Sequence, residues 1–254
     1  FPSAHIRALA LDRPLVVGMR GAGKSFWSEV LTDDRLRPTV ASFIKGYDKL
    51  VGVCAIRWDQ GGPFSTRLPD STVLTQALQE GLEPRLLWLV LVLNELRGIC
   101  SARGIVVPMP EVSQGWTEVL RWSRLHPDAI RGAFEQLNAT LTHEGQVVLV
   151  VMDALDRMAA HIAQSIDCLR GLLQLVLDAR PLKGLRFKVF LREDMTNMPS
   201  VLSFPDASKL VNEAVHLQWS REDIYALHWH KLAQQSPIFQ KLIEGHFGSA
   251  ESTQ

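Results

Sequence analysis

An octapeptide near the start of the chain constrains its fold more than any other segment. Residues 18–25 read GMRGAGKS and match the pattern G-x-x-x-x-G-K-S/T at every fixed position. The apolar run at 13–17 precedes the octapeptide and favours a β-strand, and residues 26–31 follow it and favour the start of a helix. A strand, a glycine-rich loop and a helix N-terminus in this order predict a phosphate-binding loop.

Each residue type in this loop suits the binding of a nucleoside triphosphate. Glycines let backbone N–H groups curve around an anion, and a helix start adds unpaired N–H donors and partial positive charge. Lys24 is expected to reach the β- and γ-phosphates, and the hydroxyl of Ser25 to bind Mg²⁺. The residues expected to contact the nucleotide are Gly18, Arg20, Gly21, Ala22, Gly23, Lys24, Ser25 and Phe26.

The alternative is a chance match in a turn that contains glycine. At the usual frequency of glycine, the four fixed positions should match by chance in roughly one chain in a hundred of this length. The requirement for a preceding strand makes a chance match rarer. The dinucleotide-binding pattern G-x-G-x-x-G is absent, because the glycines are spaced G-x-x-G-x-G.

A second buried strand is predicted to end in an acidic residue. Residues 147–152 form a continuous apolar run, as in a parallel strand that is buried on both faces. Asp153 follows directly and should emerge at the carboxyl edge of the sheet, where ligands bind in open α/β folds. We therefore expect Asp153 to hold Mg²⁺ together with Ser25. The alternative is that Asp153 caps the helix that follows.

Asp156 is the candidate catalytic acid. An acid near the γ-phosphate can orient or deprotonate the attacking water. Many phosphate-loop ATPases place a glutamate directly after the metal-binding acid, but here that position is Ala154. The alternative is that Asp156 is an acidic residue that stabilises a helix N-terminus.

Two arginines are candidates for contact with phosphate. Arg192 lies at the end of the strand predicted at 187–191, and its guanidinium either senses the γ-phosphate or pairs with Glu193 or Asp194. Arg20, inside the loop, could fold back on phosphate or face a neighbouring subunit, although exposure to solvent is the favoured expectation.

Strand and helix patterns alternate along the chain. Strands are expected at 13–18, 51–56, 147–152, 187–191 and 215–217, with 40–44 as the alternative to 51–56. Helices are expected at 3–11, 26–31, 75–103, 127–141, 162–176 and from 220 onward. Residues 33–38 are expected to form a turn. This alternation predicts a parallel sheet flanked by helices, and 254 residues suffice for one large α/β domain.

Composition narrows the function classes. The 27 basic and 27 acidic side chains balance, which argues against a dedicated binder of nucleic acid or anionic membranes. Cys54, Cys100 and Cys168 are far apart and are expected to be reduced, buried thiols of a cytoplasmic protein. The apolar stretch 86–93 is shorter than the roughly 20 residues that span a bilayer, so we expect a buried helix. Because the chain begins with Phe1, we expect a fragment or a processed protein.

Three segments resemble a known class of ATPases. The sequence VVLVVMDALDR at 147–157 resembles the Walker B segment of the STAND signalling ATPases, and KAP-type bacterial NTPases carry a similar D-x-L-D-R. The sequence FLREDM at 190–195 is similar to their sensor strand. Residues 217–232 look like the strand and helix that lead into their C-terminal lid.

The resemblance implies a three-layer P-loop NTPase of the additional-strand class, related to AAA+ proteins, with a mainly parallel central sheet. The NTPase core would cover 1–218 with a helical insertion at about 63–145, and 219–254 would begin a helical lid. The ligands would be ATP and Mg²⁺. The expected role is a nucleotide-dependent switch that assembles with itself or controls an effector, in bacterial sensing or antiviral defence.

One departure from the family pattern bears on turnover. The STAND segment usually ends in Asp-Glu, whereas here it ends in Asp156-Arg157. We therefore expect slow hydrolysis. The alternatives are a nucleotide-binding scaffold without turnover, a small-molecule kinase that uses the same loop, and a nucleic-acid motor.

Overall fold

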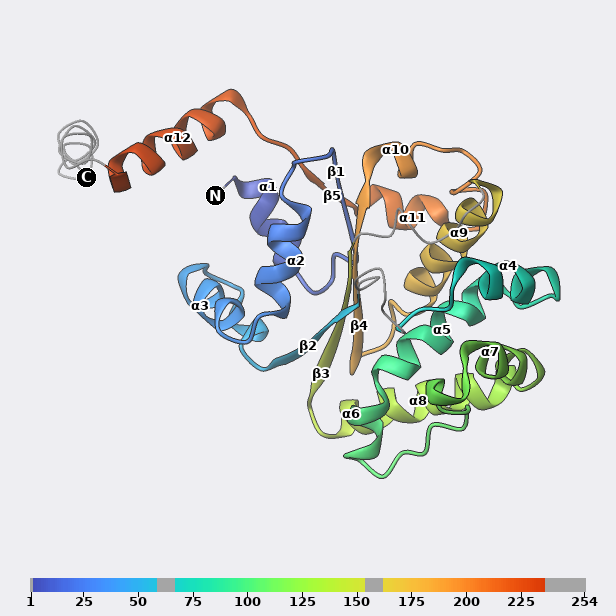
Figure 1. The fold of residues 1–254 in the computed structure, drawn as a ribbon. Coiled ribbons are helices and arrows are strands. Elements are labelled where there is room, and N and C mark those ends of the chain that lie inside the picture. The colour runs from blue at the N-terminus through green and yellow to red at the C-terminus, as the bar shows by residue number, and fades with distance from the viewer. Residues whose placement is uncertain (1, 59–66, 154–161, 236–254) are drawn as a thin grey trace.

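The computed structural model describes residues 2–58, 67–153 and 162–235, and in them a central sheet lies between two helical layers (Figure 1). The sheet has five strands, and every pair of neighbours runs parallel. The strands are β1 (Leu15–Gly18), β2 (Val53–Trp58), β3 (Val147–Met152), β4 (Leu185–Arg192) and β5 (Val215–Leu217). Their order is β2-β3-β4-β1-β5, so β4 separates β1 from β3.

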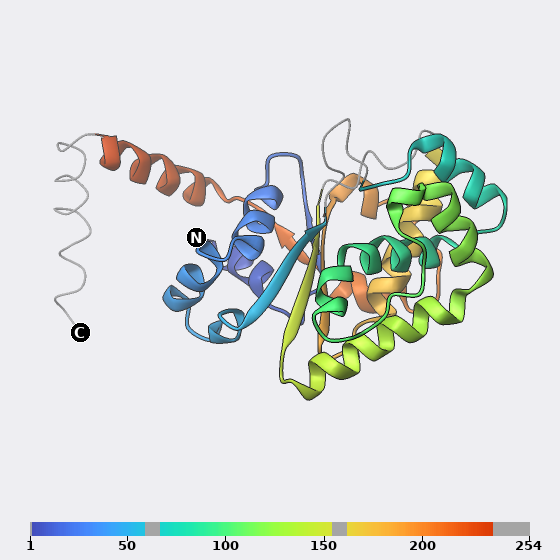
Figure 2. The ribbon, with the colours of Figure 1, turned by 60° about the horizontal axis from the view of Figure 1, so that its bottom comes forward.

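Two layers of unequal size cover the sheet (Figures 1 and 2). The smaller layer holds α1 (Ser3–Ile6), η1 (Arg7–Leu9), α2 (Lys24–Thr32), α3 (Leu36–Phe43) and η2 (Asp48–Leu50). The larger layer holds α4 (Ser71–Gln79), α5 (Pro84–Glu95), α6 (Arg97–Ser101), η3 (Val112–Gln114), α7 (Trp116–Leu125), α8 (Pro127–His143), α9 (Ile162–Asp178) and α11 (Ala207–Asn212). Helix α10 (Glu193–Thr196) follows β4 at the carboxyl edge, and α12 (Arg221–Gln235) projects away from the sheet.

The strands alternate their side chains between the two layers. In β3, Val148, Val150 and Met152 belong to the core under the larger layer. Leu149 and Val151 belong to the core under α2. Both faces are therefore apolar, and the continuous apolar run predicted as a doubly buried strand is confirmed.

The predicted elements are largely confirmed, with two exceptions. The single helix expected at 75–103 is three helices, because Gly81 takes a φ of +92° and Pro84 begins α5 at a position where its missing N–H costs no bond. The turn expected at 33–38 is wrong over its second half, because α3 begins at Leu36 and accommodates Pro38 in its first turn.

The expectation for the apolar stretch is confirmed, whereas that for the cysteines is wrong at one position. Residues 86–93 are all buried in α5, and no helix in the described ranges is long and apolar enough to cross a membrane. Cys100 and Cys168 are buried, and burial raises the pKa of Cys168 to about 11. Cys54 is exposed, because β2 is the edge strand of the sheet.

A buried lysine ties β4 to the segment before β1. Lys188 is fully buried, and its Nζ donates hydrogen bonds to the carbonyl oxygens of Ala10 and Arg13. Burial disfavours the charged amine and lowers its pKa to about 7. Lys188 thus fixes the approach of the chain to β1 from the side opposite to the loop 18–25.

Candidate functional site

The loop 18–25 joins β1 to α2 at the carboxyl edge of the sheet, and its three glycines are each required by local geometry. Gly21 and Gly23 take φ values of +83° and +98°, which side chains with a Cβ rarely adopt. A Cβ on Gly18 would lie 3.0 Å from the Cβ of Ala22 and 3.1 Å from that of Leu217. The glycine spacing seen in the sequence therefore matches a tightly curved loop packed against β5.

Lys24 curls back over the loop from the first turn of α2. Its Nζ donates to the carbonyl oxygens of Gly18 and Met19, both at 2.8 Å. The ammonium group is thereby held at the mouth of the loop. Because the first N–H groups of α2 have no acceptor within the helix, positive charge and N–H donors converge at this point.

The other residues predicted to contact the nucleotide differ in their exposure. Ser25 is exposed in the first turn of α2, and the Phe26 side chain beside it is 47% exposed. Ala22 is buried. Arg20 is exposed, which agrees with the expectation that its side chain faces solvent.

Asp153 is buried, directly beyond β3, at the same edge of the sheet. The register pairs Met152 with Val189, and Gly18 with Arg192, across the intervening strand β4. Along the strand direction, Asp153 therefore lies about two residues, or roughly 7 Å, short of the level of Gly18. Across the sheet, the two residues are separated by two strand spacings, or about 10 Å. This places a carboxylate near the loop, while residues 154–161 that would decide the capping alternative lie outside the described residues.

Asp156 lies outside the described residues. Its expected role as the catalytic acid stays a prediction.

Arg192 ends β4 beside the loop and is engaged by its own chain. Its Nε and Nη2 donate to the two carboxylate oxygens of Asp194 at 2.9 and 2.6 Å. This hydrogen bonding holds the pKa of Asp194 below its ordinary value. Of the two expectations for Arg192, the pairing with Asp194 is the one observed, and the guanidinium still lies next to the register position of Gly18.

Residues far away in the sequence also support the loop. The indole Nε1 of Trp219, just after β5, donates to the carbonyl oxygen of Ala22 at 3.1 Å. His5 of α1 lies beneath, in ring contact with Trp219 and hydrogen-bonded to Trp27. No local sequence pattern predicts the role of Trp219, because its contacts with Ala22 and His5 join positions about two hundred residues apart.

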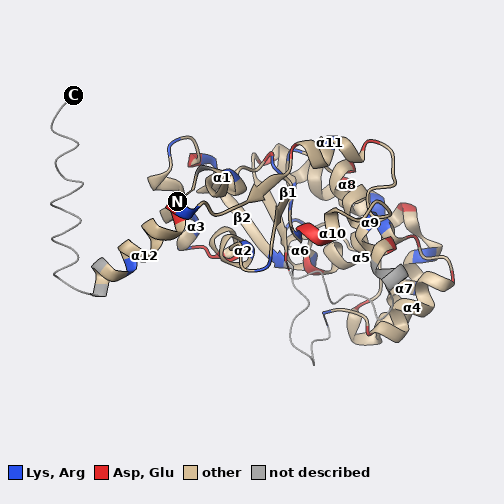
Figure 3. Cartoon of the chain, turned by 90° about the horizontal axis from the view of Figure 1, so that it is seen from above, with Lys and Arg blue, Asp and Glu red and all other residues tan. Residues whose placement is uncertain are grey.

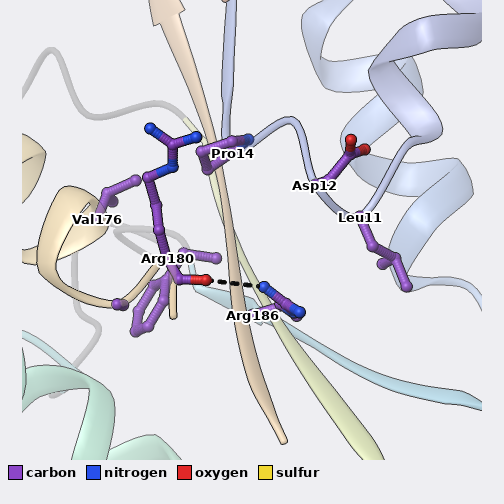
Figure 4. A pocket seen from close by; sticks show the side chains of 8 residues that line it. Leu11, Asp12, Pro14, Val176, Arg180 and Arg186 are labelled. Carbon is purple, nitrogen blue, oxygen red and sulfur yellow. Dashed lines mark hydrogen bonds between the residues drawn. The ribbon is translucent and has the colours of Figure 1, made fainter. Parts of the chain in front are cut away.

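The cavities outside this edge are weaker candidates for a ligand site. Figure 4 shows one of about 120 Å³ at the opposite edge of the sheet, lined by Leu11, Asp12, Pro14, Val176, Ala179, Arg180, Arg186 and Phe187. Arg186 donates to the carbonyl oxygen of Arg180 at 3.0 Å, and Arg180 pairs with Glu213 at 2.6 Å. Both guanidinium groups therefore already have acceptors in the protein.

A second hollow, of about 290 Å³, lies between α5, α8 and α9. At its rim Arg85 pairs with Asp178 at 2.7 Å and Arg131 with Glu83 at 3.5 Å. Among the described residues, no three acidic, histidine or cysteine side chains gather closely enough to hold a metal ion without another ligand.

Comparisons with protein-family models, with curated proteins and with solved structures found no match to the chain. The function of the loop edge is therefore inferred from its own residues and geometry.

Proposed function

We propose that this chain is an ATP-dependent switch module that binds Mg-ATP at the loop 18–25 and hydrolyses it slowly. The observation that carries the proposal is the loop itself. Gly21 and Gly23 adopt positive φ values that curve the backbone of the loop, and the Lys24 ammonium group is held against its carbonyl oxygens. A curved backbone with an ammonium group and a helix N-terminus suits a polyphosphate better than a neutral ligand.

The strand order gives independent support. The family resemblance implies an additional-strand core in which the metal-binding strand is not adjacent in sequence to the loop strand, and β2 lies between β1 and β3 along the chain. Both strand ends lie at the carboxyl edge of the parallel sheet, where ligands bind in open α/β folds. Nucleotide at this edge would therefore lie between the loop and Asp153.

The residues present fit a magnesium ion bound together with nucleotide. The glycine-lined loop would form the anion site. The exposed hydroxyl of Ser25 and the buried carboxylate of Asp153 would supply two oxygen ligands to the ion. When bound, Mg²⁺ would neutralise charge on the phosphate oxygens. Within the protein, Lys24 would bind phosphate oxygens and Ser25 and Asp153 would hold the ion.

The proposed reaction is hydrolysis of the terminal phosphoanhydride. A water oxygen bonds to the γ-phosphorus, the bond from that phosphorus to the bridging oxygen breaks, and ADP and inorganic phosphate leave. Asp156 is the residue proposed to orient the water. Arg192 would leave Asp194, bind the γ-phosphate and stabilise the charge on it. The Asp156-Arg157 ending is the reason to propose slow turnover.

The switch role rests on a second observation, the surface of α12. Five of its large apolar side chains are 41–63% exposed, namely Ile224, Tyr225, Leu227, Trp229 and Leu232. A helix with apolar residues on much of its circumference is usually covered by another part of an assembly. We therefore propose that α12 contacts an effector or a second copy, in the bacterial sensing or defence setting that the resemblance implies.

Calorimetric titration with Mg-ATP tests the proposed binding. Lys24→Ala should weaken binding by tenfold to a hundredfold, on the order expected for loss of hydrogen bonds to a charged group. Lys209→Ala is the matched control, because Lys209 is an exposed lysine paired with Asp206 on α11. No binding by the unmodified chain, or equal binding by the Lys24 variant, would overturn the proposal.

Phosphate release separates the rival functions. Release without an acceptor supports hydrolysis over a kinase, and a rate indifferent to DNA and RNA argues against a motor. Figure 3 shows acidic and basic residues interspersed over the described helices, a distribution that also argues against a nucleic-acid motor. Binding without release would instead favour the scaffold.

A further inference from the structure

His5 is a buried histidine whose tautomer is fixed by its partners. The indole Nε1 of Trp27 donates to His5 Nδ1 at 3.1 Å, and an indole N–H can only donate. Nδ1 must therefore be the unprotonated nitrogen, so Nε2 carries the hydrogen and donates to the carbonyl oxygen of Gln218 at 3.1 Å. Burial lowers the pKa of His5 and favours this neutral form.

The same imidazole orients Trp219. The two rings meet edge to face with centroids 4.7 Å apart, and Gln218, bonded to His5, is the preceding residue. From this position the Trp219 indole reaches the loop and donates to the carbonyl oxygen of Ala22 at 3.1 Å. Helix α1, helix α2 and the segment after β5 thus meet at one imidazole beneath the loop.

The bond to Ala22 has a direct consequence for the neighbouring amide. The carbonyl of Ala22 and the N–H of Gly23 belong to one planar peptide unit, which is trans. In a trans unit the two groups point in opposite directions. By holding the Ala22 carbonyl, Trp219 therefore sets the direction of the Gly23 N–H, one of the donors available to an anion in the loop.

Trp219 is also attached to the start of α12. Ser220 and Asp223 form a capping box, in which the Ser220 hydroxyl accepts from the Asp223 N–H and the Asp223 carboxylate accepts from the Ser220 N–H, both at 3.0 Å. The helix therefore begins in a fixed relation to Trp219. A rotation of the Ala22–Gly23 peptide that displaces the indole must also displace the start of α12.

We propose that Trp219, oriented by His5, is a positioning residue that directs the Gly23 N–H toward a bound phosphate and couples occupancy of the loop to the orientation of α12. This inference rests on the proposed nucleotide binding. The coupling is reciprocal, so that a partner bound to α12 changes the affinity of the loop for nucleotide by the same factor.

Two variants separate the link from simple packing. Trp219→Phe keeps an aromatic ring against His5 and removes the N–H donor. His5→Phe keeps a buried ring and removes both of its hydrogen bonds. Trp122→Phe is the matched control, because Trp122 stacks on His126 in the larger helical layer, with centroids 4.4 Å apart. Circular dichroism checks that each variant is folded.

The experiment measures nucleotide affinity and helix position in the same protein. The exposed Cys54 is first replaced by serine, and spin labels are attached to cysteines introduced by Ser42→Cys on α3 and Gln234→Cys on α12. The distance between the two labels is measured with and without a non-hydrolysable ATP analogue. We expect Trp219→Phe and His5→Phe to bind the analogue about fivefold to tenfold more weakly, as for one lost hydrogen bond. The label separation should change on binding in the parent and in Trp122→Phe, and not in the two link variants.

The outcomes distinguish the two proposals. If the parent binds no nucleotide, the proposed function fails and this inference fails with it. If the parent binds and Trp219→Phe shows the same affinity and the same change in separation, nucleotide binding stands and the link is overturned. If the separation in the parent does not change on binding, the coupling to α12 is overturned.

Discussion

Arg192 and Asp194 form a two-bond ion pair at the end of β4, one strand over from the last residue of β1. Helix α10, which carries Asp194, lies beside the end of β1 (Figure 3). In the proposed function Arg192 must leave Asp194 in order to bind the γ-phosphate, so the acid competes with the ligand.

Asp194→Asn should therefore increase the preference for ATP over ADP. Both side chains are about half exposed, so the pair contributes little energy and the expected gain is about twofold to fivefold. Arg192→Ala should lower the affinity for ATP and leave that for ADP almost unchanged. Competition titrations of both nucleotides measure the ratio, and an unchanged ratio in both variants would remove Arg192 from the site.

Asp153 and Asp156 are expected to affect different steps. Asp153→Asn should weaken binding of ATP in the presence of Mg²⁺ and leave binding in EDTA unchanged, because it removes a ligand of the ion and none of the phosphates. Asp156→Ala should leave the affinity for ATP within about threefold and slow phosphate release by about a hundredfold, the lower limit for loss of a general base. Asp128→Asn, at an exposed position on α8, is the control for both. Equal effects of the two variants on affinity would contradict this division.

Features encoded in a contiguous run of residues can be predicted from the sequence. Features that depend on contacts between residues far apart along the chain cannot. The loop 18–25 and the end of β3 are each encoded in a contiguous run of residues, so their motifs are readable. Even β5 is predicted from three residues, because Val215 and Leu217 alternate with His216. The link through His5 and Trp219 and the pairing of Arg192 with Asp194 depend on which side chains the folded chain brings together.

The edge position of β2 illustrates the same limit for packing. Residues 51–56 read as a core strand from their composition, but the strand forms at Val53–Trp58 on the edge of the sheet and leaves Cys54 exposed. The strand order is fixed by tertiary packing and cannot be obtained from the run of residues alone. Likewise residues 33–38 read as a turn from their polar composition, although α3 begins at Leu36, two residues before Pro38.

Two helical glycines should respond in opposite directions to the same substitution. A Cβ on Gly171 of α9 would lie 2.7 Å from the backbone carbon of Pro84, at the crossing of α9 with α5, whereas a Cβ on Gly132 of α8 meets nothing within 4 Å. Alanine raises helix propensity at both positions by about 0.5–1 kcal/mol. Gly132→Ala should thus stabilise the protein by about that amount, and Gly171→Ala should destabilise it by about 1–3 kcal/mol because the helices must move apart. Urea unfolding measures both, and stabilisation by Gly171→Ala would contradict the close crossing.

Lys188 should make the stability of the protein depend on pH in a defined window. Its pKa is about 7 in the folded chain and near its ordinary value of 10.5 when unfolded, so between these values the unfolded chain binds more protons. The free energy of unfolding should therefore rise with pH across this window, by at most about 1.4 kcal/mol per pH unit, and this contribution should be flat below pH of about 7.

Lys188→Met tests this dependence, since methionine fills the buried space without a titrating group. It leaves the carbonyl oxygens of Ala10 and Arg13 without their lysine donor, so the variant should be destabilised by about 1–3 kcal/mol at high pH. Urea titrations at about pH 6.5, 8 and 9.5 give the difference between parent and variant, in which the other titrating groups cancel. The free energy of unfolding of the parent should rise relative to that of Lys188→Met as pH rises. Parallel curves for the parent and Lys188→Met would mean that the buried amine keeps an ordinary pKa.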